Sequence, residues 1–571
     1  MENPGSNREV SDVELALEDV GHCGLYHVWL ILLMALPNIL VGAHMGSSVF
    51  LAMIPTHYCI TEQADKISNV CNITWVEEYN EMILGEKSSC NMIYYSNTST
   101  IDCSIWQQNI QNQTILTPMP ETRTCDAWVF DHSVMKTTIA TEFGLVCGNI
   151  WASYVTQSIF MAGVLVGNIF IGLTSDRFGR RVAFLVSAVG SVTFGIATAF
   201  ADSFVTFCIL NGLTGIFVYC MFPVLFTLVS ELVVARYRAA LAQFAEAGFG
   251  TGFMMLALVA VFTRDWRRLQ LAISAPIAVS LIVWWVLPES PRWLILNDQR
   301  KEANEIIGRM KQVNNLTTGC QRNQDGEATG CEEMKTFSSK TLDNDVIVTS
   351  SNVYGFLDLV RTSNLRRVSI IQFYQWFAVS CVYYGLTLNA AELGGDAFLN
   401  FFLIALVEVI GVFLVIPLVE KAGRVPCSSL SEVVAGIFCI LMSYIPKDIS
   451  WLYIGCSLVG KFAITVAFSV MYIHISELYP TPVRSVASGA CNAWARLGAI
   501  ASPVIAMLRL LVPDLPYIVF GILSIISGIL ILMTTETSKQ QLLPTLEEGE
   551  RFLASNPGPL VTMWRKLKSR R

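Results

Sequence analysis

The chain has 571 residues, of which 53% are hydrophobic and only 15% charged, and its mean hydropathy is +0.51. These values argue against a water-soluble globular protein and favour a protein that lies in lipid. The formal net charge of −7 offers no basic surface, so no nucleic-acid partner is expected.

Apolar stretches recur along the chain, and each is near the roughly 20 residues that cross a ~30 Å hydrocarbon layer. Residues 1–25 are polar and acidic, so the first stretch should serve as its own uncleaved signal. The sequence predicts an all-α membrane protein with twelve transmembrane helices. These lie at about 26–54, 151–173, 182–201, 205–228, 240–263, 268–287, 367–387, 397–418, 427–445, 450–475, 486–509 and 515–535.

The spans divide the chain into two bundles of six helices. The first bundle covers 26–287 and contains a long loop at 55–150, and the second covers 367–535. The remaining parts are an N-terminal segment at 1–25, a connecting loop at 288–366 and a tail at 536–571. We expect these three to lie in the cytoplasm.

The loop at 55–150 carries an even number of cysteines and three glycosylation sequons. Such a cluster predicts disulfides in an oxidising compartment, although the sequence cannot choose among the pairings and unpaired thiols remain the alternative. No C-x-x-C spacing occurs, so we expect no metal site. The cysteines are Cys59, Cys71, Cys90, Cys103, Cys125 and Cys147, and the sequons begin at Asn72, Asn97 and Asn112.

If the loop at 55–150 lies outside the cell, both termini of this plasma-membrane protein lie in the cytoplasm. Short turns rich in arginine agree with this topology, because positive charge collects on the cytoplasmic side. Arg177, Arg180 and Arg181 follow the second span. One turn disagrees, since Arg264 and Arg267 fall between the fifth and sixth spans, on the predicted outer side.

Charged motifs repeat between the two halves at nearly equal offsets. SDRFGR at 175–180 corresponds to VEKAGR at 419–424, and SEL at 230–232 corresponds to SEL at 476–478. Pro-Glu-Ser at 288–290 corresponds to Thr-Glu-Thr at 535–537. A duplication of six spans about an axis along the membrane normal explains the repeat.

We expect these charges to form a gating network at the cytoplasmic ends of both bundles. In this hypothesis, Glu231 pairs with Arg180 and Glu477 with Arg424, and these pairs clasp that side while the other side is open. The alternative is that the charges only fix topology. The gating candidates are Asp176, Arg180, Glu231, Glu420, Arg424, Glu477 and Arg484.

Three motifs, GLTSDRFGRR at 172–181, PESPRWL at 288–294 and SELYPTPVR at 476–484, resemble those of the major facilitator superfamily. With the cysteine-rich loop, the chain is similar to the organic cation, anion and carnitine transporters, solute carrier family 22. The carnitine and zwitterion branch is the nearest in appearance. This resemblance covers 18–538 and implies a transporter, and the absence of nucleotide-binding and hydrolase motifs agrees with a protein that is not an enzyme.

Ionisable residues inside spans are costly in lipid and usually functional. Arg496 lies deep in the eleventh span, where the resemblance implies arginine in anion and carnitine members and aspartate in cation members. We expect its guanidinium to bind a substrate carboxylate. The alternative is a structural pair with Glu408.

Glu246 and Glu408 supply negative charge in the fifth and eighth spans, and the resemblance places both near substrate. Coupling sites or helix-packing pairs are the alternative for either residue. His44 in the first span is expected to be a hydrogen-bonded core histidine.

Aromatic residues provide the second half of a pocket for an ammonium group. Trp376 and Tyr383 are seven residues apart in the seventh span and therefore share a helix face. By resemblance, Asn38 in the first span contacts substrate or sodium. No bound cofactor is expected, although sodium or proton coupling is open.

The sequence therefore predicts a secondary-active transporter of small organic ions, carnitine-like zwitterions or organic cations, that works by alternating access. A polyspecific organic anion carrier is one alternative. A receptor or scaffold that kept the fold without transporting is another. The oligomeric state is open.

Overall fold

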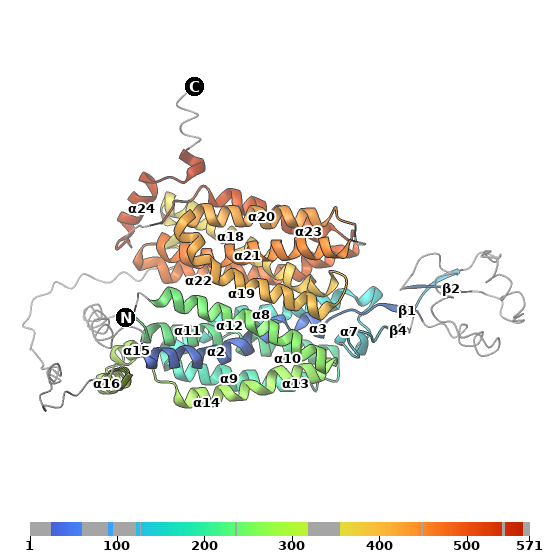
Figure 1. The fold of residues 1–571 in the computed structure, drawn as a ribbon, viewed down its shortest axis with the longest axis horizontal. Helices are drawn as coiled ribbons and strands as arrows, with labels where there is room; N and C mark the ends of the chain where they lie inside the picture. The colour runs from blue at the N-terminus through green and yellow to red at the C-terminus, as the bar shows by residue number, and fades with distance from the viewer. Residues whose placement is uncertain are drawn as a thin grey trace, which may run out of the picture.

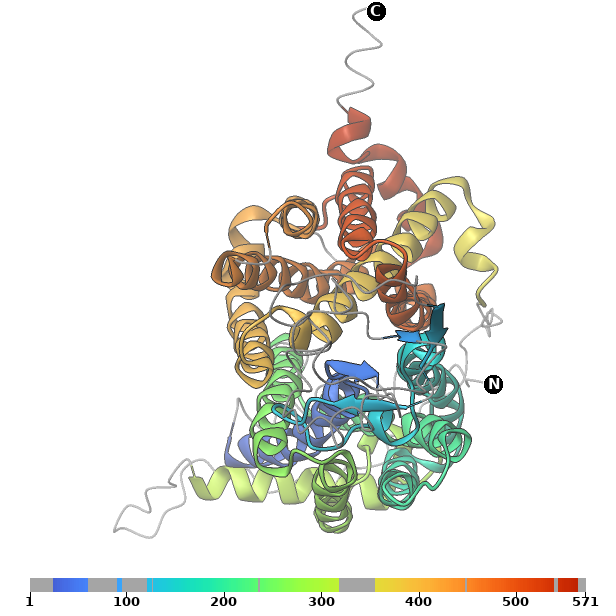
Figure 2. The same cartoon turned by 90° about the vertical axis from the view of Figure 1, so that its right-hand side faces the viewer.

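The computed structural model describes residues 24–59, 90–94, 121–125, 127–234, 237–317, 355–446, 449–538 and 543–562. Nearly all of these residues form helices, which run side by side in two bundles (Figure 1). Seen along the helices, the first bundle occupies one side of the molecule and the second the other (Figure 2).

Six helical spans form the first bundle, three of them built from more than one helix. A break at Ser47 divides the first span, and Pro276 lies in the 3-10 turn that divides the sixth. The elements are α2 (Leu25–Gly46) with α3 (Ser48–Leu51), α8 (Trp151–Phe178), α9 (Arg180–Thr198), α10 (Phe204–Val218) with α11 (Met221–Leu232), α12 (Arg238–Thr263), and α13 (Trp266–Ser274), η3 (Ala275–Ala278) and α14 (Val279–Val286).

The second bundle repeats this arrangement. Its elements are α18 (Ser363–Leu388), α19 (Ala397–Ala422), α20 (Arg424–Met442), α21 (Ser450–Leu478), α22 (Thr481–Ala506) and α23 (Leu515–Ile531), with the 3-10 turns η4 (Asn389–Glu392) and η5 (Met507–Leu510). Among the described residues, ten helical segments are long and apolar enough to cross a membrane. The shorter α23 and the more polar α18, which buries Gln372 and Gln375, bring the set to the twelve predicted spans.

Two helix pairs join the bundles: α12 packs against α19, and α8 packs against α22. Within the second bundle α22 also lies close to α18, since a Cβ on Gly498 would stand 2.2 Å from the carbonyl oxygen of Phe377. Only glycine permits this approach. It lets α22 lie close enough to α18 for Arg496 to reach the Tyr384 hydroxyl.

Segments outside the bundles lie at opposite ends (Figure 1). One end carries β1 (His57–Cys59), which pairs antiparallel with β4 (Trp128–Phe130), and β2 (Asn91–Tyr94), which pairs with β3 (Glu121–Thr124). The short α7 (Ile139–Glu142) and η1 (Cys147–Asn149) follow. The other end carries α15 (Pro291–Leu296), α16 (Arg300–Thr317), α17 (Asp358–Arg361) and α24 (Leu546–Ser555).

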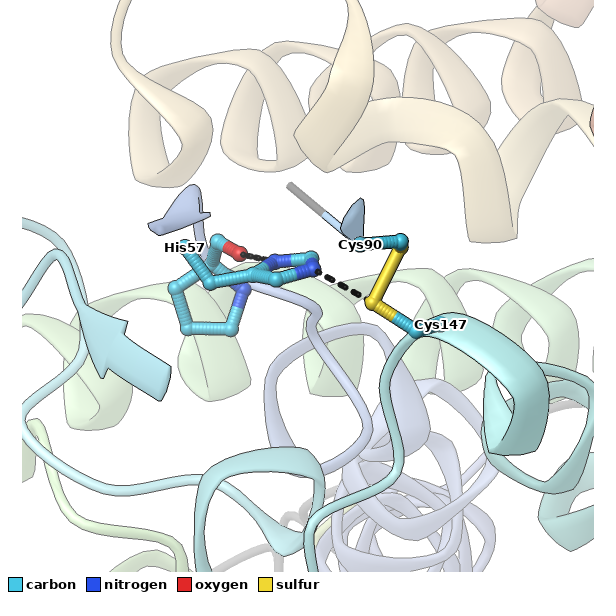
Figure 3. The surroundings of a disulfide bond; sticks show 4 residues. His57, Cys90 and Cys147 are labelled. Carbon is cyan, nitrogen blue, oxygen red and sulfur yellow. Dashed lines mark hydrogen bonds between the residues drawn. A yellow bond between two sulfur atoms is a disulfide. The ribbon is translucent and has the colours of Figure 1, made fainter. Parts of the chain in front are cut away.

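Cys90 and Cys147 form a disulfide, and His57 lies beside it with Nε2 3.8 Å from the Cys147 sulfur (Figure 3). Because the two sulfurs are bonded to each other, neither is a thiolate ligand for a metal. Cys125 is also disulfide-bonded. Cys71, Cys103 and the side chain of Cys59 lie outside the described residues, as do Asn72, Asn97 and Asn112.

The turn whose arginines disagree with the predicted topology has a structural explanation. Arg267 forms an ion pair with Glu142 and donates to the carbonyls of Ala199 and Ala201, both at 2.7 Å. Arg264 donates to the carbonyl of Ser133 at 3.3 Å. These arginines anchor the segment at 127–146 to the first bundle, so their charge has a local use at this end.

Candidate functional site

In the first bundle, charged residues meet where α8 ends and α9 begins. The Arg180 guanidinium lies 3.2 Å from Glu231 and 3.4 Å from Asp176. The Glu289 carboxylate accepts the backbone N–H groups of Arg180 and Arg181 at 3.0 and 3.1 Å. A carboxylate at the start of a helix satisfies N–H groups that have no partner within the helix and interacts favourably with the helix dipole.

The second bundle reproduces this site at the junction of α19 and α20. Arg424 binds Glu477 through two hydrogen bonds, 2.9 Å from Nε and 2.7 Å from Nη2. Glu536 accepts the N–H groups of Arg424 and Val425 at 3.0 and 2.9 Å. Partial burial alone would raise the pKa of Glu536, but hydrogen bonds from these N–H groups and from Ser538 hold it below its usual value.

A glycine with positive φ begins each of these junctions, Gly179 at +94° and Gly423 at +87°. A Cβ at Gly179 would stand 2.5 Å from Glu289 Oε2, and one at Gly423 would stand 2.9 Å from Glu536 Oε2. The turn therefore needs glycine for both its backbone conformation and the carboxylate beside it. Glu289 and Glu536 are not among the gating residues proposed from the sequence, although their shared offset marks them.

The predicted pairs of Arg180 with Glu231 and of Arg424 with Glu477 are present, and each lies within one bundle. Glu420 is exposed and makes no ion pair with a described residue. Arg484 donates to the carbonyl of Tyr479 at 3.3 Å. A clasp between the bundles therefore stays a prediction.

Arg496 lies at the centre of the seam between the bundles. It is 3% exposed, its Nη2 donates to the hydroxyl of Tyr219, and its Cζ lies 4.0 Å from the centre of that ring. Nη1 donates to Tyr384 at 3.4 Å, and Nε has no hydrogen-bond partner in the described part of the chain. Since Tyr219 belongs to the first bundle, this buried cation crosses the seam, yet no described carboxylate pairs with it.

Glu246 on α12 lies on the opposite side of the same seam. Its Oε2 accepts a 2.7 Å hydrogen bond from the hydroxyl of Ser469 on α21. It makes no ion pair with a described residue. The first bundle thus presents a carboxylate to the second bundle, and the second presents Arg496 to the first.

Glu408 is neutralised by a residue that the sequence analysis does not single out. Lys461 on α21 is fully buried, with Nζ 2.9 Å from Glu408 Oε2 and 2.8 Å from Thr387 Oγ1. The hydroxyl of Tyr383 donates to Glu408 Oε1 at 2.6 Å. The alternative in which Arg496 is the partner of Glu408 is therefore wrong, because Lys461 occupies that position.

Aromatic rings connect these charged groups. Trp376 and Tyr383 lie on one face of α18 and both approach Phe468 of α21, with ring centres 6.2 and 5.3 Å away. Tyr472 stands edge-on to Trp376 at 4.8 Å. The indole N–H of Trp376 is buried and has no partner within the described ranges of the chain, which leaves one donor available to a bound molecule.

Asn38 on α2 is fully buried, and neither its amide nitrogen nor its oxygen has a hydrogen-bond partner among the described residues. His44 is also buried, but it is satisfied, with Nδ1 3.1 Å from the carbonyl of Leu40 and Nε2 3.1 Å from Ser274 Oγ. His44 is thus a hydrogen-bonded core residue, as expected, while Asn38 has unused hydrogen-bonding capacity.

Two buried charges in the second bundle escaped the sequence analysis, Lys461 and Glu432. Glu432 on α20 accepts from Gln375 at 2.5 Å and from Ser428 at 2.7 Å. The signal for both was the one that identified Arg496, a charge in the middle of an apolar span. Once they are included, two glutamates, one lysine and one arginine are buried in the described part of the second bundle, together with His474.

Residues 114–548 match the sugar (and other) transporter family. The chain is 32% identical over 544 residues to the organic cation transporter protein of Drosophila melanogaster, with 95% of each chain covered. It is 31% identical over 551 residues to solute carrier family 22 member 2 of Homo sapiens, with 95% of each chain covered. Solute carrier family 22 member 3 of Rattus norvegicus is also 31% identical, covering 95% of this chain and 96% of the relative.

Solved structures share the fold. The inward open conformation of the xylose transporter XylE from E. coli has a TM-score of 0.56 at 16% identity, covering 92% of this chain and all of that one. A D-xylose-proton symporter has a TM-score of 0.55 at 14% identity, covering 91% of this chain and all of that one. The chain belongs to solute carrier family 22 of the major facilitator superfamily, a family of multi-pass membrane transporters rather than enzymes.

Proposed function

We propose that the chain transports small organic ions by alternating access and prefers zwitterions with a carboxylate and a quaternary ammonium, of the carnitine or betaine kind. One observation carries the proposal. Arg496 and Glu246 are opposite charges on opposite sides of the seam, and neither has an ionic partner among the described residues. Each is held instead by a neutral hydroxyl of the other bundle.

A buried charge without a counter-ion is costly, so a substrate that supplies the missing charge is favoured. The planar guanidinium of Arg496 suits a carboxylate, which can accept two parallel hydrogen bonds. Glu246 suits the cation at the other end of a zwitterion. The ring of Trp376 would add about 0.5–2 kcal/mol for a desolvated ammonium. The Tyr383 ring already holds a cation, because Lys461 Nζ lies 3.2 Å from its centre.

Binding would couple to movement because the two charges come from different bundles. A zwitterion that replaces the hydroxyls of Tyr219 and Ser469 contacts both bundles at once. Its binding favours the conformation in which the bundles close around the substrate. The matching ion networks within each bundle then keep the helix ends rigid during rocking. Closure of the cytoplasmic side through Asp176, Glu420 and Arg484 belongs to the same proposal.

Transport of organic cations without a carboxylate is the second candidate. One of the three relatives reported above is named organic cation transporter protein, and Glu246 together with the aromatic rings serves a cation without help from Arg496. An organic anion carrier is less favoured, since the additional cation Lys461 is neutralised by Glu408. A receptor that does not transport is the remaining alternative.

An uptake assay separates these candidates. Cells expressing the chain should accumulate labelled carnitine more readily than tetraethylammonium or urate, and the same assay with and without sodium tests ion coupling. Arg496→Gln should lower carnitine uptake about 10–100-fold, the loss expected for a charge-assisted hydrogen bond of 1.5–3 kcal/mol, and should spare tetraethylammonium. Arg366→Gln, at an exposed arginine of α18, is the matched control.

Carnitine uptake that survives in Arg496→Gln would remove the zwitterion proposal and leave cation transport. Uptake of urate alone would favour the anion carrier, and no uptake of any compound would favour the receptor.

We also propose that the protein lies in the plasma membrane with both termini in the cytoplasm and the segment at 55–150 outside. The Cys90–Cys147 disulfide and the bound state of Cys125 support this orientation, since disulfides persist in oxidising compartments. Epitope tags at either terminus should be detected only after permeabilisation, and antibody labelling of intact cells would contradict the orientation.

A further inference from the structure

A cavity separate from the central charges lies at the end of the bundles that carries the disulfide. It has a volume of about 260 Å³, close to the lower end of the ~300–1,000 Å³ range of small-molecule pockets. Its walls come from both bundles: α3, α8 and the segment around Asp131 on one side, and η4 and α22 on the other. None of the charged residues of the central seam lines it.

The floor of this cavity holds polar groups without partners. Gln157 and Ser153 on α8 are each 4% exposed and line it, and neither Gln157 Nε2 nor Ser153 Oγ has a hydrogen-bond partner among the residues that the structure describes. The other amide atom of Gln157 is engaged, because its Oε1 accepts from the hydroxyl of Ser48. A buried donor in this position is unfavourable unless a bound molecule or water accepts from it.

The rim supplies one negative charge, Asp131, which forms no ion pair with a lysine or arginine of the described residues and has His132 beside it. Asp131 is exposed and accepts from Ser133 and Thr56, whose groups are all neutral. The backbone N–H and then the hydroxyl of Ser133 hold the pKa of Asp131 below its usual value, so its carboxylate is ionised at neutral pH. The other carboxylate of the lining, Glu392, is already paired with Arg509.

We propose that this cavity is a second binding site, for a small organic cation that also carries a hydrogen-bond acceptor. The cation lies toward Asp131 at the rim, and the acceptor reaches the Gln157 amide and the Ser153 hydroxyl on the floor. Because both bundles form the walls, a molecule bound here holds the bundles together at this end and slows their separation. A molecule bound here therefore acts on the same movement of the bundles that binding at the centre uses.

Equilibrium binding of labelled choline to the full-length protein in lipid nanodiscs tests the site. Wild type should show a saturable component that Asp131→Asn weakens at least about tenfold, in line with loss of a charge-assisted contact. The matched control is Asp202→Asn, an exposed aspartate outside the cavity that follows α9 at the same end. Glu246→Gln, which alters only the central seam, should leave this component intact.

A second arm tests the acceptor. Choline should bind several-fold more tightly than tetramethylammonium, which has the same charge and no hydroxyl, and Gln157→Leu should abolish this preference. Unchanged choline binding in Asp131→Asn, or loss of all choline binding in Glu246→Gln, would overturn the proposal. These experiments measure choline binding and not carnitine uptake, so their outcome does not depend on the proposed transport function.

Discussion

The two bundles are alike at one end and different in the middle. At the helix junctions each has a glycine with positive φ, an arginine paired with a glutamate, and a carboxylate on two backbone N–H groups. In the interior, the first bundle carries Glu246 and the hydrogen-bonded His44, whereas the described part of the second carries the buried residues Glu408, Glu432, Lys461, Arg496 and His474. The duplicated part is therefore the arrangement that fixes helix ends, and the buried charges lie mainly in the second copy.

The largest effect is expected when Lys461, the buried cation that pairs with Glu408 in the second bundle, is removed. Lys461→Met leaves Glu408 buried with only the Tyr383 hydroxyl, which should cost about 3–5 kcal/mol of stability. The thermal unfolding midpoint of purified protein measures the loss. Adding Glu408→Gln to Lys461→Met should recover most of it, and no recovery in the double variant would contradict the assigned pair.

Substitution of either junction glycine by alanine should lower stability, and the loss should be larger for Gly179 in the first bundle than for Gly423 in the second. Gly179→Ala and Gly423→Ala each force a Cβ into a positive-φ turn, at a cost of about 1–3 kcal/mol. Gly179→Ala should be the worse, since its Cβ would stand closer to the neighbouring carboxylate. Unfolding midpoints test the order, with Gly455→Ala, whose added Cβ meets open space, as the control. Midpoints equal to that control would contradict the shared turn.

Removing the charge of a capping carboxylate should have a smaller effect. Glu536→Gln should lose about 1–2 kcal/mol at neutral pH, a value that allows for partial exposure. Because the folded pKa of Glu536 is lowered, this contribution is present above the unfolded glutamate pKa of about 4.3 and disappears as pH falls through the folded value.

Unfolding midpoints of wild type and Glu536→Gln should therefore differ at pH 7 and converge in acid. A difference that grows as the pH falls would contradict the capping role.

The smallest effects are expected on the transport rate when the junction arginines, Arg424 and Arg180, are replaced by lysine. Arg424 holds Glu477 with two hydrogen bonds and Arg180 holds Glu231 with one. Lysine cannot reproduce the forked geometry, so Arg424→Lys should slow transport about fivefold and Arg180→Lys less than twofold. Initial uptake rates at matched surface expression decide this, and equal losses would mean that the two junctions act identically.

The sequence predicted the fold well, because twelve apolar runs and repeated charges at fixed offsets are visible without coordinates. It also predicted the pairs of Arg180 with Glu231 and Arg424 with Glu477, since a repeated glutamate needs a repeated partner. It could not assign Glu408, because which of several buried cations reaches a carboxylate depends on how helices far apart in sequence pack. The hydroxyls that hold Arg496 and Glu246 were invisible for the same reason.

The central claim is that Arg496 and Glu246 bind the carboxylate and the ammonium of a zwitterionic substrate. Equilibrium binding of carnitine and of its neutral-amide derivative to wild type and Arg496→Gln tests this most directly. Wild type should prefer carnitine at least about tenfold, and Arg496→Gln should bind both compounds equally well. If Arg496→Gln keeps the preference of wild type, the carboxylate is recognised elsewhere and the account is wrong.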